Sequence, residues 1–236
     1  MSYHRWIARI AAVAAVAGAI AQVAATLLEP ERPEKPLAAI QVVAGNGIWT
    51  FDRLLDLIGL LLAVGALTVV GRGFANQPAR AWADLGQPFL VLLAALGSGA
   101  VVTGAILKDV AVAWTSAAPA ERPAQLAVFA ATSDLTDALF FGAFMAMGVY
   151  LGTLGAAILA GGVYARWVGW ASLASSVLVL AGNLLVLVAD SAFLAVLAGL
   201  MVFMVVLVAV GVTLWRQVET GSARGDLGRE GVAEPG

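Results

Sequence analysis

The chain has 236 residues, of which 61% are hydrophobic and 12% charged, and its net charge is −2. Soluble domains carry about 25% charged residues, so this composition excludes an ordinary soluble fold, and the absence of a Lys- or Arg-rich run argues against a nucleic-acid partner. The chain has no cysteine, and its one histidine is His4, which excludes thiol catalysis, iron–sulfur clusters, bis-histidine haem and multi-histidine metal sites. No cofactor is expected.

Six apolar stretches are each long enough to cross a bilayer, which takes about 20 residues per helix. They are rich in Ala and Leu and show no alternation of period two, so they predict helices rather than strands. The expected helices cover residues 7–28, 51–71, 88–107, 135–159, 168–189 and 192–215. The expected fold class is therefore all-α, a polytopic membrane helical bundle over residues 1–216, followed by a disordered cytoplasmic tail at 217–236.

Two long segments separate these helices on one side of the membrane, residues 29–50 and 109–133. The first opens with EPERPEKP, whose prolines predict extended chain, and continues with an apolar part that either lies along the membrane or covers the bundle. The second is expected as a loop of mixed character, packed on the rim of the bundle. The first apolar stretch runs to Leu28, longer than the 7–15 residues of a signal peptide core, and predicts an uncleaved helix.

The basic residues fall unequally on the two sides of the predicted bundle. Eight arginines lie at the ends that include both termini, and five Lys or Arg lie at the other ends. Cytoplasmic loops carry the excess of Lys and Arg, so both termini are expected in the cytoplasm of a bacterium, with the chain multi-pass in its inner membrane. The tryptophans agree, because none is expected at mid-membrane: five lie near the inner ends, and Trp49 and Trp114 near the outer ends.

Polar side chains gather in the outer halves of five of the six predicted helices. We take as the candidate outer polar cluster Gln22, Asp52, Asp56, Lys108, Asp134, Asp137, Asn183 and Asp190. Carboxylates inside membrane helices are expensive and are functional candidates by default. The pattern indicates no coordination geometry, so no metal site is assigned.

Asp56 is the most informative member of this cluster. It lies on the same helix face as Asp52 and about 6 Å deeper at 1.5 Å per residue. Two carboxylates on one face repel each other, which favours a shared proton or cation. We expect Asp56 to point into the bundle, protonated or paired with Arg53, Lys108 or Gln22.

A structural explanation of the same acidic residues is favoured over a functional site. Asp52, Asp134 and Asp137 lie where helices are expected to start, and carboxylates there cap free N–H groups and meet the positive end of the helix dipole. Arg53 can pair with Asp56 at i,i+3. Asp190 can belong to a tight turn between the last two helices. Capping explains Asp56 least well.

A short element near the fifth predicted helix resembles a known pattern. Residues Arg166, Trp167, Gly169 and Trp170 form an Arg-Trp-x-Gly-Trp sequence. With the six-helix layout, it is similar to a family of uncharacterised bacterial six-helix integral membrane proteins, a domain of unknown function. The resemblance implies this fold and transfers no activity.

Three functions are compatible with these observations, in decreasing order of preference. The first is a non-enzymatic binding, sensing or accessory membrane protein with an outer carboxylate cluster. The second is a small proton- or cation-coupled transporter, which requires a cavity reaching Asp56. The third is a membrane enzyme acting on a lipid or isoprenoid, which requires an apolar pocket that ends at an Asp. Beyond the lipid bilayer, the candidate ligands are a proton, a cation or a lipid, and the candidate partners are a second copy or another membrane protein.

Overall fold

The computed structural model describes residues 3–30, 33, 35–189 and 192–230, with side chains described from Arg5 to Glu219 within those ranges. Seven helices account for nearly all of this part of the chain, and it contains no strand. They are α1 (Tyr3–Leu28), α2 (Pro36–Gly45), α3 (Trp49–Arg72), α4 (Gln77–Ser116), α5 (Arg122–Gly161), α6 (Arg166–Val186) and α7 (Phe193–Glu230). All except α2 are long and apolar enough to span a membrane, which confirms the predicted all-helical class and the predicted number of helices able to cross a bilayer.

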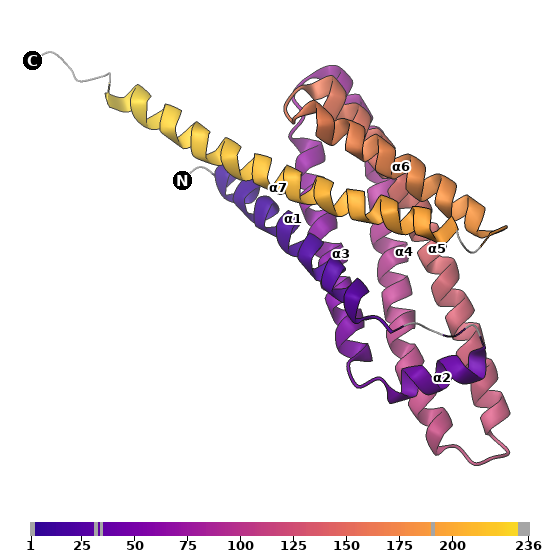
Figure 1. The fold of residues 1–236 in the computed structure, drawn as a ribbon. Coiled ribbons are helices and arrows are strands. Elements are labelled where there is room, and N and C mark those ends of the chain that lie inside the picture. The colour runs from indigo at the N-terminus through magenta and orange to yellow at the C-terminus, as the bar shows by residue number, and fades with distance from the viewer. Residues whose placement is uncertain (1–2, 31–32, 34, 190–191, 231–236) are drawn as a thin grey trace, which may run out of the picture.

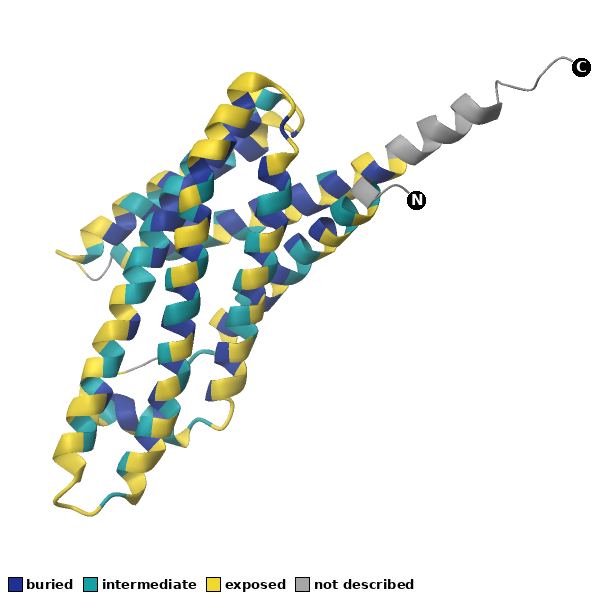
Figure 2. Cartoon of the chain, turned by 180° about the vertical axis from the view of Figure 1, so that it is seen from behind, coloured by how far each residue is buried: buried dark blue, intermediate teal, exposed yellow. Residues whose placement is uncertain are grey.

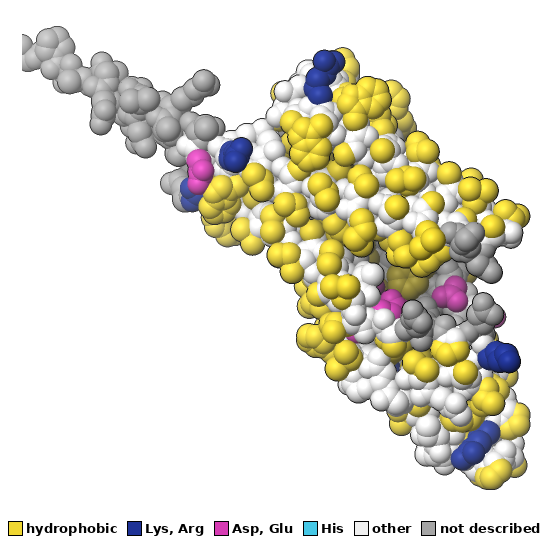
Figure 3. Space-filling view, viewed as in Figure 1, with side chains coloured by type: hydrophobic (Ala, Val, Ile, Leu, Met, Phe, Trp, Pro, Cys, Tyr) yellow, Lys and Arg dark blue, Asp and Glu magenta, His cyan; other side chains and the backbone are white. Residues whose placement is uncertain are grey.

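The six long helices form a closed ring in the order α1, α3, α4, α5, α6, α7 and back to α1, each packed on its two neighbours (Figure 1). Buried residues follow the faces that the helices turn toward one another, and exposed residues cover the outside (Figure 2). That outside is largely apolar (Figure 3), with large side chains such as Val13, Leu61 and Val177 more than half exposed. A continuous exposed apolar surface is what a helical bundle presents to lipid.

The helices α4 and α5 are much longer than expected. The predicted loop at 109–133 is wrong, because α4 continues to Ser116 and α5 already begins at Arg122. Its proline, Pro123, occupies the first turn of α5, where a missing N–H costs nothing. With 40 residues each, the two helices measure about 60 Å, roughly twice a bilayer core.

The start of α4 also differs from the expectation. Residue 88 was expected to open this helix, but α4 begins at Gln77 and contains Pro88 in its interior. Asn76 supplies the cap, because its side-chain oxygen accepts a hydrogen bond of 3.0 Å from the Ala79 N–H. A capped first turn ahead of the proline explains why the helix starts early.

The apolar part of residues 29–50 forms α2, which lies across α4 and α5 and covers that end of the bundle (Figure 1). Ile40 and Val43 of α2 are fully buried against Leu107 of α4 and Phe129 of α5. The predicted packing of this segment on the bundle is confirmed by these contacts. The α4–α5 hairpin extends beyond α2 on the same side.

Close packing of α5 on α6 depends on small residues. A Cβ atom on Gly148 would lie 2.6 Å from Leu180, and one on Gly155 would lie 2.8 Å from the Gly169 carbonyl oxygen. Ser176 of α6 donates a 2.7 Å hydrogen bond to the Gly148 carbonyl. Gly148 and Gly152, spaced four residues apart, both face α6, which is the close-approach arrangement of packed membrane helices.

The start of α1 and the end of α7 lie on the side of the ring away from α2 and the α4–α5 turn (Figure 1). The helix α7 continues to Glu230, beyond the predicted domain boundary at 217. The side chains from residue 220 onward and all of residues 231–236 lie outside the described part. The predicted disordered tail therefore stays a prediction.

Candidate functional site: a central cavity ending at Asp56

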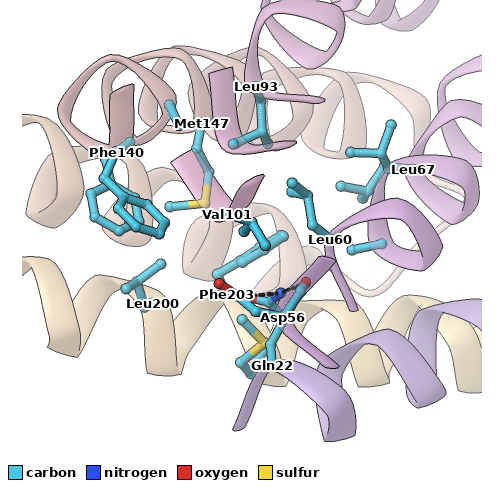
Figure 4. A pocket seen from close by; sticks show the side chains of 16 residues that line it. Gln22, Asp56, Leu60, Leu67, Leu93, Val101, Phe140, Met147, Leu200 and Phe203 are labelled. Carbon is cyan, nitrogen blue, oxygen red and sulfur yellow. Dashed lines mark hydrogen bonds between the residues drawn. The ribbon is translucent and has the colours of Figure 1, made fainter. Parts of the chain in front are cut away.

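A narrow cavity of about 60 Å³ lies inside the ring (Figure 4). Five helices contribute to its wall: α1, α3, α4, α5 and α7. Fourteen of its 16 lining residues are apolar, and the two polar ones, Gln22 and Asp56, lie together at one end. Along α3 the lining runs from Asp56 to Leu67, about 16 Å at 1.5 Å per residue. The cavity is thus long, thin and polar at one end only.

Gln22 holds the Asp56 side chain at this end. Its side-chain N–H₂ donates to the Asp56 carboxylate and to the Asp56 backbone carbonyl, each at 2.7 Å. Small residues bring α1 close enough for this contact, because a Cβ on Gly59 would lie 3.0 Å from Gln22. The expectation that Asp56 points into the bundle with Gln22 as a partner is confirmed.

Arg53 lies next to this pair and is 3% exposed. Its guanidinium pairs with Glu29, lies 3.2 Å from the carboxylate of Asp52 and 4.0 Å from that of Asp56. It also stacks over the Trp49 ring, with 4.9 Å to the centroid. Within the described part of the chain, three carboxylates therefore surround one guanidinium beside the cavity.

Trp49 and Gly104 fix the position of Arg53 against α4. The indole N–H of Trp49 donates a 2.8 Å hydrogen bond to the Gly104 carbonyl, and a Cβ on Gly104 would lie 3.3 Å from Arg53 Cδ. Trp49 is the first residue of α3 and so lies at the predicted outer end, but it is 1% exposed. The helices α2 and α4 cover its ring, and Gly104 supplies the hydrogen-bond acceptor.

Lys108 has a different role from the one predicted. Its ammonium group donates to the carbonyl oxygens of Val43, Ala44 and Asn46 at 3.0, 2.8 and 2.7 Å. These carbonyls end α2, so Lys108 neutralises the negative end of that helix. Within the described residues Lys108 does not pair with Asp56, and it lies one turn beyond Gly104, away from the cavity.

The remaining predicted residues are dispersed. Asn183 is buried and donates a 2.9 Å hydrogen bond to the Phe141 carbonyl, which joins α6 to α5. Asp134 and Asp137 are exposed on α5. Asp137 precedes the cavity-lining Phe140 by three residues and so shares its helix face. Asp190 lies outside the described residues.

The capping interpretation of the acidic residues fails for α5. Because α5 starts at Arg122, Asp134 and Asp137 lie more than three turns inside it and cannot cap its first turn. Asp52 does lie in the first turn of α3, but the N-cap is Ile48 and makes no side-chain cap bond. The predicted pairing of Arg53 with Asp56 is confirmed, with 4.0 Å between a guanidinium nitrogen and a carboxylate oxygen.

Sequence reasoning missed Glu29, which it assigned to an extended loop. Glu29 follows Gln22 by seven residues, which is two helical turns. If α1 is extended by one residue beyond Leu28, the two side chains therefore lie on the same helix face. That spacing could have placed Glu29 with Arg53. Thr136, whose hydroxyl donates to Thr103 at 2.9 Å, was likewise missed because its helix was expected to begin only one residue earlier.

Searches of protein-family models, curated proteins and solved structures found no match for this chain. The resemblance carried by Arg166, Trp167, Gly169 and Trp170 stays a prediction. Both tryptophans are more than half exposed at the start of α6, as interface anchors would be. Within the described residues, no group of three His, Cys, Asp or Glu side chains is arranged to hold a metal ion.

Proposed function

We propose that this protein is a non-enzymatic binding protein of the bacterial inner membrane, with both termini in the cytoplasm. Its ligand is a slender amphiphile with a cationic end. The single observation that carries the proposal is the cavity inside the ring, apolar along its length and ending at the Asp56–Gln22 pair. Small-molecule sites combine apolar walls with a few placed polar groups in this way.

The shape of the cavity supports a chain-like occupant. A volume of about 60 Å³ spread over some 16 Å of α3 leaves no room for a ring system or a branched body. A single unbranched alkyl chain fits such a space after small side-chain movements. Water is not a competitor along the apolar part, because a buried water needs two to four polar partners.

The charge beside the cavity supports a positively charged end group. The carboxylate of Asp56 lines the cavity itself, and that of Asp52 lies nearby against the same guanidinium of Arg53. Asp137 adds a carboxylate to the α5 face that continues into the cavity wall at Phe140. Figure 3 shows acidic side chains on the walls of a hollow between α7 and the end of the molecule that carries α2. An amine arriving from that side would meet carboxylates first.

Transport is the second candidate, because a carboxylate within a membrane cavity is also the arrangement of a proton- or cation-coupled carrier. The lining supports it less well, since it is apolar from Leu60 to Leu67 and offers no further charged side chain toward the other membrane face. Lipid chemistry would need a second proton-transfer group beside Asp56. Its polar neighbour on the cavity wall is Gln22, an amide that does not exchange protons at neutral pH.

The proposal is tested with n-octylamine and n-octanoate as probes of equal chain length and opposite charge. We expect octylamine, and not octanoate, to raise the apparent melting temperature of the purified protein in neutral detergent. Asp56→Asn keeps the shape of the side chain and removes its charge, so the octylamine response should fall at least fivefold. Asp134→Asn removes an exposed carboxylate away from the cavity wall and should leave the response unchanged.

A second variant tests the apolar part independently of charge. Ala143 is buried on the cavity wall, and Ala143→Leu would place three extra carbon atoms in the space. This variant should lose the octylamine response relative to its own unliganded melting temperature. Equal responses to octylamine and octanoate, or an undiminished response in both Asp56→Asn and Ala143→Leu, would overturn the proposal.

A further inference from the structure

A groove on the outside of the ring lies directly beside the central cavity, and one side chain of α7, Met204, lines both spaces. We propose that the protein has a side entrance here, between α1 and α7, through which the amphiphile passes from the bilayer into the cavity, with Met204 as its gate. The proposal rests on the function proposed above and adds the route by which the ligand reaches Asp56. It is carried by the shared side chain, the direction of the two spaces and the packing of α1 on α7.

The groove has a volume of about 590 Å³ and lies between α1 and α7. The walls that these two helices contribute are apolar throughout. Ile20 and Leu27 of α1 are 64% and 80% exposed, and Val205 of α7 is 56% exposed, so the groove is open to lipid. The alkyl chain of a membrane amphiphile fits such a lining, because it brings no polar group that would have to be satisfied there.

At Met204 the groove and the cavity are separated by a single side chain. On α1, Gln22 lines the cavity and the next residue, Val23, lines the groove. On α7, Phe203 lines the cavity and Val205 lines the groove, with Met204 between them. Gln22 and Phe203 lie beside Asp56 at the polar end of the cavity (Figure 4). A methionine side chain has three rotatable bonds, so a change of rotamer can open this wall without a movement of the backbone.

The groove and the cavity run side by side in the same direction. The groove follows α1 from Leu27 to Ala19, a rise of about 12 Å at 1.5 Å per residue. The hydrogen bonds between Gln22 and Asp56 place these two residues at one depth, and α1 and α3 run in opposite directions (Figure 1). The deeper part of the groove therefore lies beside the part of the cavity that begins at Asp56. An alkyl chain in the groove, with its amine at the Leu27 end, can move sideways into the cavity without turning over.

The packing of α1 on α7 lets this seam open at one end only. A Cβ atom on Gly211 would lie 2.9 Å from the Ala12 carbonyl oxygen and 3.2 Å from the Ala15 Cβ, and both alanines are buried. The two backbones touch at this point, because small residues allow a close approach. Met204 lies two helical turns away, where the groove separates the lipid-facing sides of the helices. The seam is thus fixed at Gly211 and filled at Met204 by a flexible side chain.

The test measures how fast n-octylamine enters and leaves the cavity. Met147 lines the cavity and not the groove, so its methyl group reports occupancy by NMR of protein labelled with ¹³C-methyl methionine in neutral detergent. Val208→Trp fills the groove without touching the cavity wall, and its indole covers Met204, because a helical side chain points back toward the start of its helix. We expect the association and dissociation rates both to fall by roughly tenfold at an unchanged dissociation constant, since a blocked route alters rates and not the equilibrium.

Two further variants make the result specific to the side entrance. Val212→Trp is the matched control: it makes the same substitution one turn further along α7, in a different groove, at a site 43% exposed against 39% for Val208. It should leave both rates unchanged. Met204→Ala shortens the shared wall and should raise the dissociation rate by roughly fivefold.

The outcomes separate the entrance from the binding function on which it rests. Unchanged rates in both Val208→Trp and Met204→Ala, or an equal slowing by Val212→Trp, would overturn the side entrance while binding at Asp56 stands. If the methyl group of Met147 does not respond to octylamine in the unmodified protein, the proposed function fails and the entrance fails with it.

Discussion

At the residue scale, Arg53 is the group on which the polar contacts of the outer end converge. Its guanidinium contacts carboxylates from the end of α1 and from α3, and it stacks on Trp49, which in turn binds α4. A buried ion pair adds little net stability over an apolar pair of the same shape, but removal of one partner is costly because the other charge stays buried. Arg53 therefore determines whether this region can fold with three acidic groups in it.

Replacement of Arg53 by Met tests that role. Arg53→Met keeps much of the apolar stem and leaves three carboxylates without their cation, which should destabilise the protein by about 3–5 kcal/mol. Arg80→Met removes an exposed pair, 71% and 68% exposed, and should cost about 1 kcal/mol or less. The measurement is denaturant or thermal unfolding in detergent. Similar losses in the two variants would contradict the central role of Arg53.

At the element scale, the sequence predicted the six long helices, but it missed the short helix α2 and underestimated the lengths of α4 and α5. Hydropathy locates the apolar part of a helix, so it found the six helices that are long and apolar enough to cross a membrane. It could not tell that the mixed segments beside Asp109 and Ser133 continue as helix, because their stability comes from tertiary packing. Leu107 and Phe129 are buried there against α2, an element whose position depends on contacts far away in the sequence.

For the candidate site too, some residue contacts were predicted from the sequence and others were not. Helical spacing correctly put Gln22 and Asp56 near each other, since both lie on inward faces at similar depth. The same logic failed for Lys108, because its partners are backbone carbonyls of α2, which carry no side-chain signal. The cavity itself could not be predicted, because it depends on how five helices pack and on glycines such as Gly97.

Packing of α5 on α6 gives the prediction at this scale. Gly155→Ala places a methyl group 2.8 Å from the Gly169 carbonyl oxygen, which cannot move without shifting its helix, and should cost about 1–3 kcal/mol. Gly65→Ala is the matched control, because a Cβ there meets nothing within 4 Å. It should be neutral or stabilise α3 by up to about 1 kcal/mol. The measurement is the melting temperature of each variant. Equal values would show that the close approach of α5 to α6 at Gly155 is not needed for stability.

At the scale of the whole molecule, the ring and the long hairpin together imply an asymmetric protein. The α4 and α5 helices measure about twice the thickness of a bilayer core. They extend past the other helices at the end that carries α2, while the chain ends lie on the opposite side. The carboxylates around Arg53 lie at the α2 end, and Arg9 and Trp215 lie at the other.

The orientation of this asymmetric molecule can be tested because the chain has no cysteine of its own. The excess of arginines at the ends with both termini predicts that the α3–α4 turn is cytoplasmic and the α4–α5 turn external. Ala75 and Ala118 are exposed in these two turns. In intact cells, a membrane-impermeant maleimide should label Ala118→Cys and should reach Ala75→Cys only after permeabilisation. The reverse pattern would place the carboxylates of Glu29 and Asp56 toward the cytoplasm, and an amine ligand would then have to come from inside the cell. Labelling of both residues from outside would contradict a bundle that spans the membrane between them.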